Sequence, residues 1–483
     1  MTQTERDPKA ADPTLAFAPP DGVTLELEEI QGDIVRAYGN AYDCTTYVFV
    51  ELHGVRAARA WLKELAPQVS DAAPWTGPAK PPHHINVALT HAGLIALGVP
   101  PQVRETFADE FRFGMAARAK RLGDVGPSAP EHWAPGLGTG EAHVLVTVNA
   151  LDPAPLTAAL DQLQALTERH GHRIVSRQNA HTLPGTREHF GFGDGFSQPA
   201  IRGATEGRTR GGGVPLAGGE WRPLEPGEFI LGYPDEDTFV DPQRRLPAAP
   251  GGALGRNSTY MVWRRLHQDV ALFRRAVKAG AAHYEGGDEA KLRAKIVGRW
   301  DNGASLVQHP ERQPPDDAFD SGSAEANDFG YATEDPSGAR CPIGSHVRRT
   351  NPRDSLGWEG RLTFRHRIIR RGMPYGEPLP EGVLEDDGAE RGLVFVCFQA
   401  SIIRQFEAIQ VQWINDGNIF GLGHDADYVM GTHRPEGGSM VVQGECPFYL
   451  GGQDDFVVTR GGEYLFVPSL SGLRAIAAGK AAG

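Results

Sequence analysis

Segments typical of strands and of helices alternate along the first half of this chain, and this alternation restricts the fold more than any other feature. Runs rich in β-branched and apolar residues predict strands at 45–51, 85–89, 143–149 and 173–176, with order beginning at a strand near Leu25. Apolar residues at helical spacing predict helices at 55–65, around Leu94 and at 156–166. Strands separated by helices in this order indicate an α+β unit of the split βαβ type.

The composition changes after Asn179, where glycine and proline become frequent, and we expect this stretch to wrap the surface or line a site. A second α+β series follows it. Strands are predicted at 260–264, 362–369, 393–399 and 464–467, a helix at 266–277 and another near Phe406. A long loop rich in Pro, Asp, Gly and Ser is predicted at 309–340.

The chain has 483 residues, more than one hydrophobic core usually serves, so two domains are expected. We place a flexible N-terminal lead at 1–24, an N-terminal domain at 25–189 and a C-terminal domain at 190–483.

Composition excludes several classes of function. The net charge of −13 argues against nucleic acid as a partner, and no stretch reaches the roughly 18 to 20 apolar residues of a membrane span. The first twenty residues lack the apolar core of a signal peptide, which favours a cytoplasmic location and leaves export by another route open. The cysteines are widely spaced without a C-x-x-C pair, so neither a zinc site nor a disulfide framework is indicated: Cys44, Cys341, Cys397 and Cys446.

Two short segments carry residues suited to chemistry. The sequence Gly191-Phe192-Gly193-Asp194-Gly195 places an acid within a glycine turn, where a carboxylate can move a proton. His346 is followed within seven residues by Arg348, Arg349 and Arg353, so a candidate metal ligand is surrounded by cations that bind carboxylates. Each segment alone also fits a simpler interpretation, a turn aspartate bonded to its own backbone or a histidine in a basic surface loop.

Taken together with a third segment, Arg367 to Gly376, these two stretches resemble the signature of the dye-decolourising peroxidase family. The resemblance continues through 29–34, 227–233, 255–258 and 392–395, and it covers the chain from about Leu25 to Leu470. It implies two ferredoxin-like (split βαβ) domains with antiparallel sheets, and one haem b per chain in the C-terminal half.

The resemblance also implies roles for single residues. His346 would be the axial ligand of the haem iron, with His366 as the next candidate. Arg348 and Arg353 would bind the haem propionates, and Gly193 and Gly195 would let the backbone approach the flat cofactor.

Asp194 would move the proton of bound hydrogen peroxide, and Arg370 would stabilise the charge that develops as the O–O bond breaks. The alternation of apolar and charged residues at 361–371 also supports Arg370, since a continuous strand would direct Arg370 inward and Arg367 and Arg371 outward.

Further residues complete the expected site. Leu393 and Phe395 would form an apolar roof over the peroxide. Asp416 is a candidate partner for the second nitrogen of His346. Electrons from bulky donors would enter through a surface Trp or Tyr, for which we select Trp413.

The expected function is therefore a haem peroxidase that uses hydrogen peroxide to oxidise dyes, phenols and similar aromatic donors by one-electron steps. A non-catalytic haem carrier is the alternative, although it would need neither Asp194 nor Arg370. A metal-free hydrolase is a further rival, and the commonest design of that class is disfavoured because no Gly-x-Ser-x-Gly is present. A homo-oligomer is left open.

Overall fold

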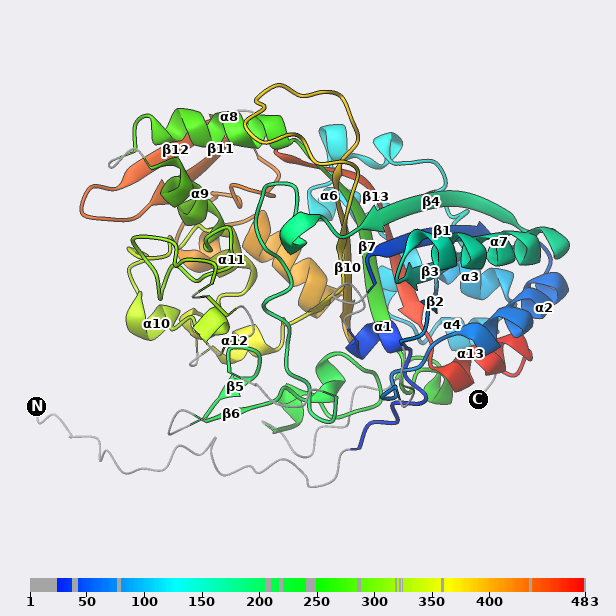
Figure 1. The fold of residues 1–483 in the computed structure, drawn as a ribbon. Coiled ribbons are helices and arrows are strands. Elements are labelled where there is room, and N and C mark those ends of the chain that lie inside the picture. The colour runs from blue at the N-terminus through cyan, green and yellow to red at the C-terminus, as the bar shows by residue number, and fades with distance from the viewer. Residues whose placement is uncertain are drawn as a thin grey trace, which may run out of the picture.

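The computed structural model describes residues 24–36, 42–75, 80–204, 210–216, 220–239, 249–284, 288–317, 319–320, 323, 325–357, 360–433 and 437–481. Most of these residues belong to two α+β halves that share one sheet (Figure 1). No helix within the described residues is long and apolar enough to cross a membrane.

The N-terminal half contains four antiparallel strands in the order β4-β1-β3-β2. They are β1 (Cys44–Glu51), β2 (His83–Leu89), β3 (Val144–Ala150) and β4 (Arg173–His181). Helix α2 (Val55–Leu65) joins the first two strands and α7 (Pro153–Arg169) joins the last two, which is the predicted split βαβ arrangement. The strand expected near Leu25 is absent, because residues 24–31 form turns that lead into the short helix α1 (Gly32–Val35).

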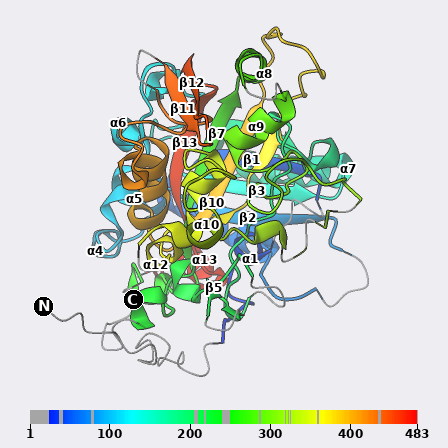
Figure 2. The same ribbon diagram turned by 90° about the vertical axis from the view of Figure 1, so that its left-hand side faces the viewer.

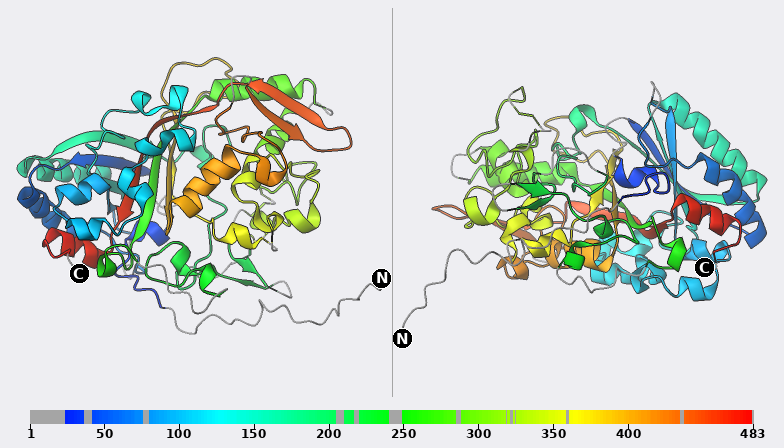
Figure 3. Two further views of the ribbon diagram at one scale, coloured as in Figure 1. Left: turned by 180° about the vertical axis from the view of Figure 1, so that it is seen from behind. Right: turned by 90° about the horizontal axis from the view of Figure 1, so that it is seen from below.

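The C-terminal half repeats this topology with the order β13-β7-β10-β8. Its elements are β7 (Thr259–Gln268), α8 (Val270–Ala281), α9 (Glu289–Val297), β8 (Ile369–Arg370), β9 (Met373–Tyr375), β10 (Gly392–Gln399) and β13 (Val457–Val467). The helix predicted near Phe406 is two π-helical segments, η13 (Ile403–Glu407) and η14 (Ile409–Ile414), and Figure 3 shows this segment in orange beside the sheet. Two antiparallel ferredoxin-like halves are therefore confirmed.

The strand predicted at 362–369 is wrong. The segment begins with the helix α12 (Arg361–Phe364), and only Ile369–Arg370 forms a strand, paired with β10. The alternation of apolar and charged residues does not correspond to a strand here, because Thr363 and Arg367, from the expected outward face, are buried together with Phe364. The segment lines a large cavity, and arginines as well as apolar side chains of this segment face it.

The two halves join where β13 meets β2, at the pair Phe466 and Leu89. Gln31 reinforces this junction from the loop before α1. Its side-chain amide donates to the carbonyls of Val87 and Pro468 at 2.8 and 2.9 Å and accepts from the Val87 N–H at 2.8 Å. A single nine-stranded sheet results, and both of its faces carry hydrophobic clusters that draw on the two halves. The domain boundary at 189/190 stays a prediction.

Helices cover the two ends of this sheet differently. Figure 1 shows α2, α7 and α13 (Leu470–Ala477) at the right, over the N-terminal half, whereas α8 to α12 gather at the left. The hairpin of β11 (Gly438–Val442) and β12 (Phe448–Gln453) projects at the upper left below α8 in Figure 1 and lies at the upper edge in Figure 2. The other short elements are α3 (His91–Ala96), α4 (Pro101–Arg104), α5 (Asp109–Phe113), α6 (Ala119–Leu122), β5 (Val214–Pro215), β6 (Trp221–Arg222), α10 (Tyr331–Glu334) and α11 (His346–Thr350).

Candidate active site

A large cavity lies in the C-terminal half between β7 and β10 on one side and α9, α11, η13 and η14 on the other. The space within it, together with the solvent at its mouth, is about 1680 Å³. Apolar side chains form much of its wall, among them Phe190, Phe192, Leu266, Val297, Ile409 and Val429. Polar groups are gathered at three places, and each contains residues that the sequence predicted.

The first polar place is His346, the first residue of α11. Its Nδ1 lies 3.1 Å from Oδ2 of Asp427, which is fully buried, and the other oxygen of Asp427 accepts the N–H groups of Val429 and Met430 at 2.9 Å. Among the described residues Nε2 of His346 has no hydrogen-bond partner and is available to a ligand in the cavity. The ring orientation is thus fixed by a carboxylate, as is usual for a metal-binding histidine.

Charge stabilises this pair in its ionised form. Burial alone would raise the pKa of Asp427, but the charge and hydrogen bond of His346 hold that pKa at about 2. Burial alone would lower the pKa of His346, and the Asp427 carboxylate outweighs this effect and raises it. The carboxylate therefore remains an anion that increases the basicity of the imidazole.

The prediction that Asp416 bonds to His346 is wrong. Asp416 accepts hydrogen bonds from the main-chain N–H and side-chain amide of Asn418 at 3.1 and 3.3 Å and closes a local turn. Asp427 follows eleven residues later and reaches the histidine only because the chain after η14 folds back beneath α11. Nothing in the local sequence distinguishes Asp427 from Asp416 or Asp425.

The second polar place is the pair Asp194 and Arg370. Arg370 Nη1 donates to Asp194 Oδ1 at 3.0 Å, and Oδ1 also accepts the N–H of Gly195 at 2.6 Å. Both side chains face the cavity, where 43% of Asp194 and 34% of Arg370 remain exposed. Burial would raise the pKa of Asp194, but the Arg370 charge outweighs it and the pKa lies below its ordinary value.

The glycines around Asp194 shape its loop. Gly195 has a φ of +90°, which glycine adopts readily, and a Cβ on Gly193 would lie 2.7 Å from the ring of Phe196. The Gly193 N–H also donates to the Asp301 carbonyl at 2.8 Å. Gly193 lines the cavity, and the packing of Phe196 explains why no side chain fits there.

The third polar place is a cluster of buried arginines, Arg299, Arg353 and Arg367, that forms no ion pair with any carboxylate of the described residues. Nη2 of Arg367 and Nε of Arg353 are buried without a hydrogen-bond partner. Burial first, and then the charges of Arg353 and Arg370, lower the pKa of Arg367 and of Arg299 to about 9. Such uncompensated cations in a protein interior indicate that an anionic ligand completes the site.

Arg348, the other predicted propionate ligand, does not line this cavity. It is buried behind α11, where it pairs with Asp335 Oδ2 at 3.0 Å and donates to the Cys341 carbonyl at 2.8 Å. The prediction failed because residues two apart on a helix point in different directions, so His346 and Arg348 cannot both face the same cavity. Arg353 does line the cavity, and its contact with a propionate stays a prediction.

Arg371 is also not directed into solvent. Its Nε donates to the carbonyls of Asp33 and Arg36 at 3.1 and 2.9 Å and fastens the strand to the loop of α1. Arg370 is therefore the arginine of the pair that faces Asp194.

Leu393 and Phe395 line the cavity from β10. His366 lies there too and is held through Nδ1 by the carbonyl of Arg404. Trp413 is only 2% exposed and packs edge-on against His366 with ring centroids 5.0 Å apart. The prediction of Trp413 as a surface residue is therefore wrong, because η14 places it inside the cavity wall.

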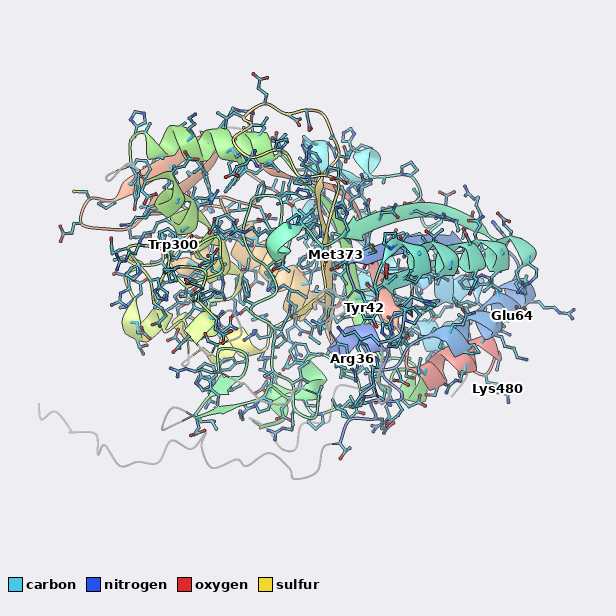
Figure 4. All side chains as sticks on the ribbon, in the orientation of Figure 1. Arg36, Tyr42, Glu64, Trp300, Met373 and Lys480 are labelled. Carbon is cyan, nitrogen blue, oxygen red and sulfur yellow. The ribbon has the colours of Figure 1, made fainter. Side chains whose placement is uncertain are left out.

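A second, smaller cavity meets the first at Glu188, Asp194, Arg370 and Leu393. Polar residues from both halves line it, including Asp33, Thr147, Asn149 and Gln198. Met373, also in its wall, is labelled near the centre of the molecule in Figure 4. Asp194 and Arg370 are thus accessible from two sides, whereas His346 faces only the first cavity.

Sequence comparison adds two family matches to this geometry. Residues 29–182 match the DyP dimeric alpha+beta barrel domain, and residues 293–420 match the C-terminal domain of Dyp-type peroxidases. Peroxidase 2 of Mycetinis scorodonius is 30% identical over 484 residues, covering 94% of this chain and 88% of that protein. The chain belongs to the dye-decolourising peroxidase family.

Other members of the family are similar over nearly their whole length. The multifunctional dye peroxidase DyP2 of an Amycolatopsis species is 29% identical, over 93% of this chain and 96% of that protein. An ancestral D-type dye-decolourising peroxidase has a TM-score of 0.77 at 28% identity, covering 93% of this chain and 99% of that one. A dye-decolourising peroxidase in complex with 2,6-dimethoxyphenol has a TM-score of 0.78 at 25% identity, covering 94% and 100%.

Proposed function

We propose that this protein is a peroxidase that binds one haem b per chain in the large cavity and uses hydrogen peroxide to oxidise aromatic donors. One observation carries the proposal. The His346–Asp427 pair, the Asp194–Arg370 pair and the unpaired arginines all open onto a single apolar cavity. These are a metal ligand, an acid–base pair and an anion site, and haem needs all three.

The residues present fit the cofactor. His346 would hold the iron through Nε2, and Asp427 would keep the other ring nitrogen protonated. Arg353 and Arg367, with Arg299 behind them, would bind the two propionates and supply the anion that these cations lack. Bound haem would supply the iron at which peroxide is cleaved, and it would then take electrons from the donors.

The protein's own part in the reaction is to move one proton and to stabilise charge. The Asp194 carboxylate accepts the proton from one oxygen of hydrogen peroxide and returns it to the other, which leaves as water. The Arg370 guanidinium stabilises the negative charge that develops between these two states. Leu393 and Phe395 limit the water around this step.

The donor class is proposed from the relatives. One solved relative was obtained in complex with 2,6-dimethoxyphenol, and we expect phenols and dyes to serve here as well. A cytoplasmic location is part of the proposal and is tested by fractionating the producing cells.

The experiment that tests the proposed function is spectroscopic and kinetic. Purified protein should show an intense visible haem band and oxidise 2,6-dimethoxyphenol only when hydrogen peroxide is added. A haem band without peroxide turnover would favour the carrier, which has no use for Asp194 and Arg370. Absence of any haem band would contradict both.

The Asp194–Arg370 pair predicts an acidic optimum. Because Arg370 holds the pKa of Asp194 below its ordinary value, the base form survives at acidic pH and is lost only as pH falls through that lowered pKa. An unperturbed Asp titrates near about 3.9, whereas a histidine base would already be protonated below about 6.5.

Stopped-flow measurement of the reaction with peroxide between pH 3 and 8 checks this expectation. Asp194→Asn should lower the rate across the range and remove the acid limb of the pH profile, which is the fall in rate at low pH. An optimum above neutral, with an Asn variant as fast as wild type, would show that Asp194 is only a turn residue.

Asp427→Asn should lower the rate of the peroxide reaction by roughly 10- to 100-fold, since it removes the anion that makes His346 a stronger ligand. It should also raise the reduction potential of the bound haem, because a less basic imidazole stabilises the ferric form less. Spectroelectrochemistry measures this shift. Asp416→Asn is the matched control and should behave as wild type, and equal effects of the two variants would contradict the assignment of Asp427.

A further inference from the structure

Gln198 lies four residues after Asp194 and bonds to the main chain of Arg370 with both ends of its side-chain amide. The Arg370 N–H donates to Gln198 Oε1 at 3.1 Å, and Gln198 Nε2 donates to the Arg370 carbonyl at 3.1 Å. This is the hydrogen-bond pattern that a neighbouring strand would supply. Gln198 also lines the second cavity, beside both members of the Asp194–Arg370 pair.

The place of Arg370 in the sheet explains why such a link is needed. Strand β8 consists of two residues and is the last strand of the sheet, paired only with β10. Arg371 directs its N–H toward β10, to the Val396 carbonyl at 2.8 Å, so Arg370 directs its own N–H and carbonyl to the outer edge. Apart from a bond between Arg371 Nη1 and the Arg370 carbonyl, Gln198 provides the hydrogen bonds on this side.

The chain that carries Gln198 is itself anchored on both sides. Before it, the Gly193 N–H donates to the Asp301 carbonyl at 2.8 Å. After it, the Ala200 N–H donates to the Gly212 carbonyl at 2.9 Å. The amide of Gln198 therefore fixes the main chain of Arg370 relative to the same short segment that bears Asp194.

The Arg370 side chain needs this support. Its guanidinium donates to Asp194 and to no other described residue, and the side chain has four rotatable torsions and is 34% exposed. Its position thus depends on where its Cα is held. A misplacement of about 1 Å in a catalytic group can cost on the order of 100-fold in rate.

We propose that Gln198 is a positioning residue, which holds Arg370 at its working distance from Asp194 by completing the outer edge of β8. The inference rests on the proposed function, because it assigns Gln198 to the same peroxide reaction. Gln198 itself contacts neither the reacting atoms nor His346.

Gln198→Met tests this directly, since methionine keeps the length of the side chain and removes both hydrogen bonds. Haem content should stay as in wild type, and the rate of reaction with hydrogen peroxide should fall roughly 10- to 100-fold. The acid limb should move to higher pH, because a displaced Arg370 no longer stabilises the Asp194 carboxylate as strongly. His346 on α11 and Glu188 in the same loop also act on the charge of Asp194, and Asp33, Arg187 and Arg371 line the same cavity; none of these groups is changed.

Cyanide supplies a readout that is independent of turnover. Hydrogen cyanide must give up its proton before it binds ferric haem, so its association rate reports the distal base. This rate, followed in the visible spectrum of the ferric holoprotein, should fall in Gln198→Met together with the peroxide rate. A purely structural role would lower the melting temperature and leave both the acid limb and the cyanide rate unchanged.

The matched control is Gln308→Met. Gln308 also donates from its amide to a main-chain carbonyl, that of Asp328 at 3.3 Å, but lies outside both cavities. It should show wild-type rates. If Gln198→Met does not fold, Gln198→Glu carries the test, because it keeps the acceptor for the Arg370 N–H and loses the donor to the carbonyl; it should also slow both reactions.

Wild-type peroxide and cyanide rates with an unmoved acid limb in the folded Gln198 variants would overturn the inference. A wild-type protein that binds no haem or does not react with peroxide would instead contradict the proposed function. The two failures are therefore distinguished by the wild-type measurement, which is made first.

Discussion

Arg370→Leu should lower the rate constant for reaction with hydrogen peroxide by roughly 100- to 1000-fold while haem stays bound. The charge that stabilises the breaking O–O bond is lost, and Asp194 loses the side-chain donor that keeps its pKa low. Burial then has the larger effect and raises the pKa of Asp194, so the acid limb of the pH profile should also move to higher pH. Stopped-flow spectroscopy over a pH series measures both effects.

Arg365→Leu is the matched control for this variant. Arg365 lies five residues earlier and pairs with Asp237 at 2.6 Å, away from both cavities, so its loss should leave the peroxide rate unchanged. A wild-type rate in Arg370→Leu would mean that the proton and the charge are handled by Asp194 and water alone.

His346→Ala should purify with little haem, since it removes the only proposed protein bond to iron and leaves the propionate contacts and the apolar wall. It also leaves the Asp427 carboxylate buried beside an empty space, with the pKa of that carboxyl no longer held at about 2 by the histidine. The ratio of haem to protein absorbance gives the occupancy, and the ferric spectrum gives the axial ligand.

His53→Ala controls for the loss of a histidine as such, because His53 is 52% exposed in the N-terminal half and should leave haem content unchanged. Full haem occupancy and an unchanged ligand spectrum in His346→Ala would identify another ligand. His366, which lines the same cavity, would then be the residue to replace next.

The split βαβ arrangement of the N-terminal half could be predicted because local patterns specify its strands and helices, whereas the two ferredoxin-like halves were expected only from the family resemblance. Each strand of the N-terminal half alternates with helices of suitable length, and these elements form with nearly the predicted bounds. The wrong predictions lie where the surroundings of the chain are unusual. At 361–371 a buried cavity places arginines inward, so apolar and charged positions no longer mark opposite faces.

The family, the two α+β halves and four residues that line the large cavity could be predicted from the amino-acid sequence: Asp194, His346, Arg353 and Arg370. Each lies in a short motif whose residue types suit proton transfer, metal binding or anion binding. The hydrogen-bond partners of these residues could be identified only in the folded structure. Asp427, and not Asp416, bonds to His346, and Gln198 bonds to the main chain of Arg370, because hydrogen bonds depend on distances between segments that here lie 81 and 172 residues apart in the chain. Arg367 lines the cavity, whereas Arg348 is buried behind α11 and pairs with Asp335.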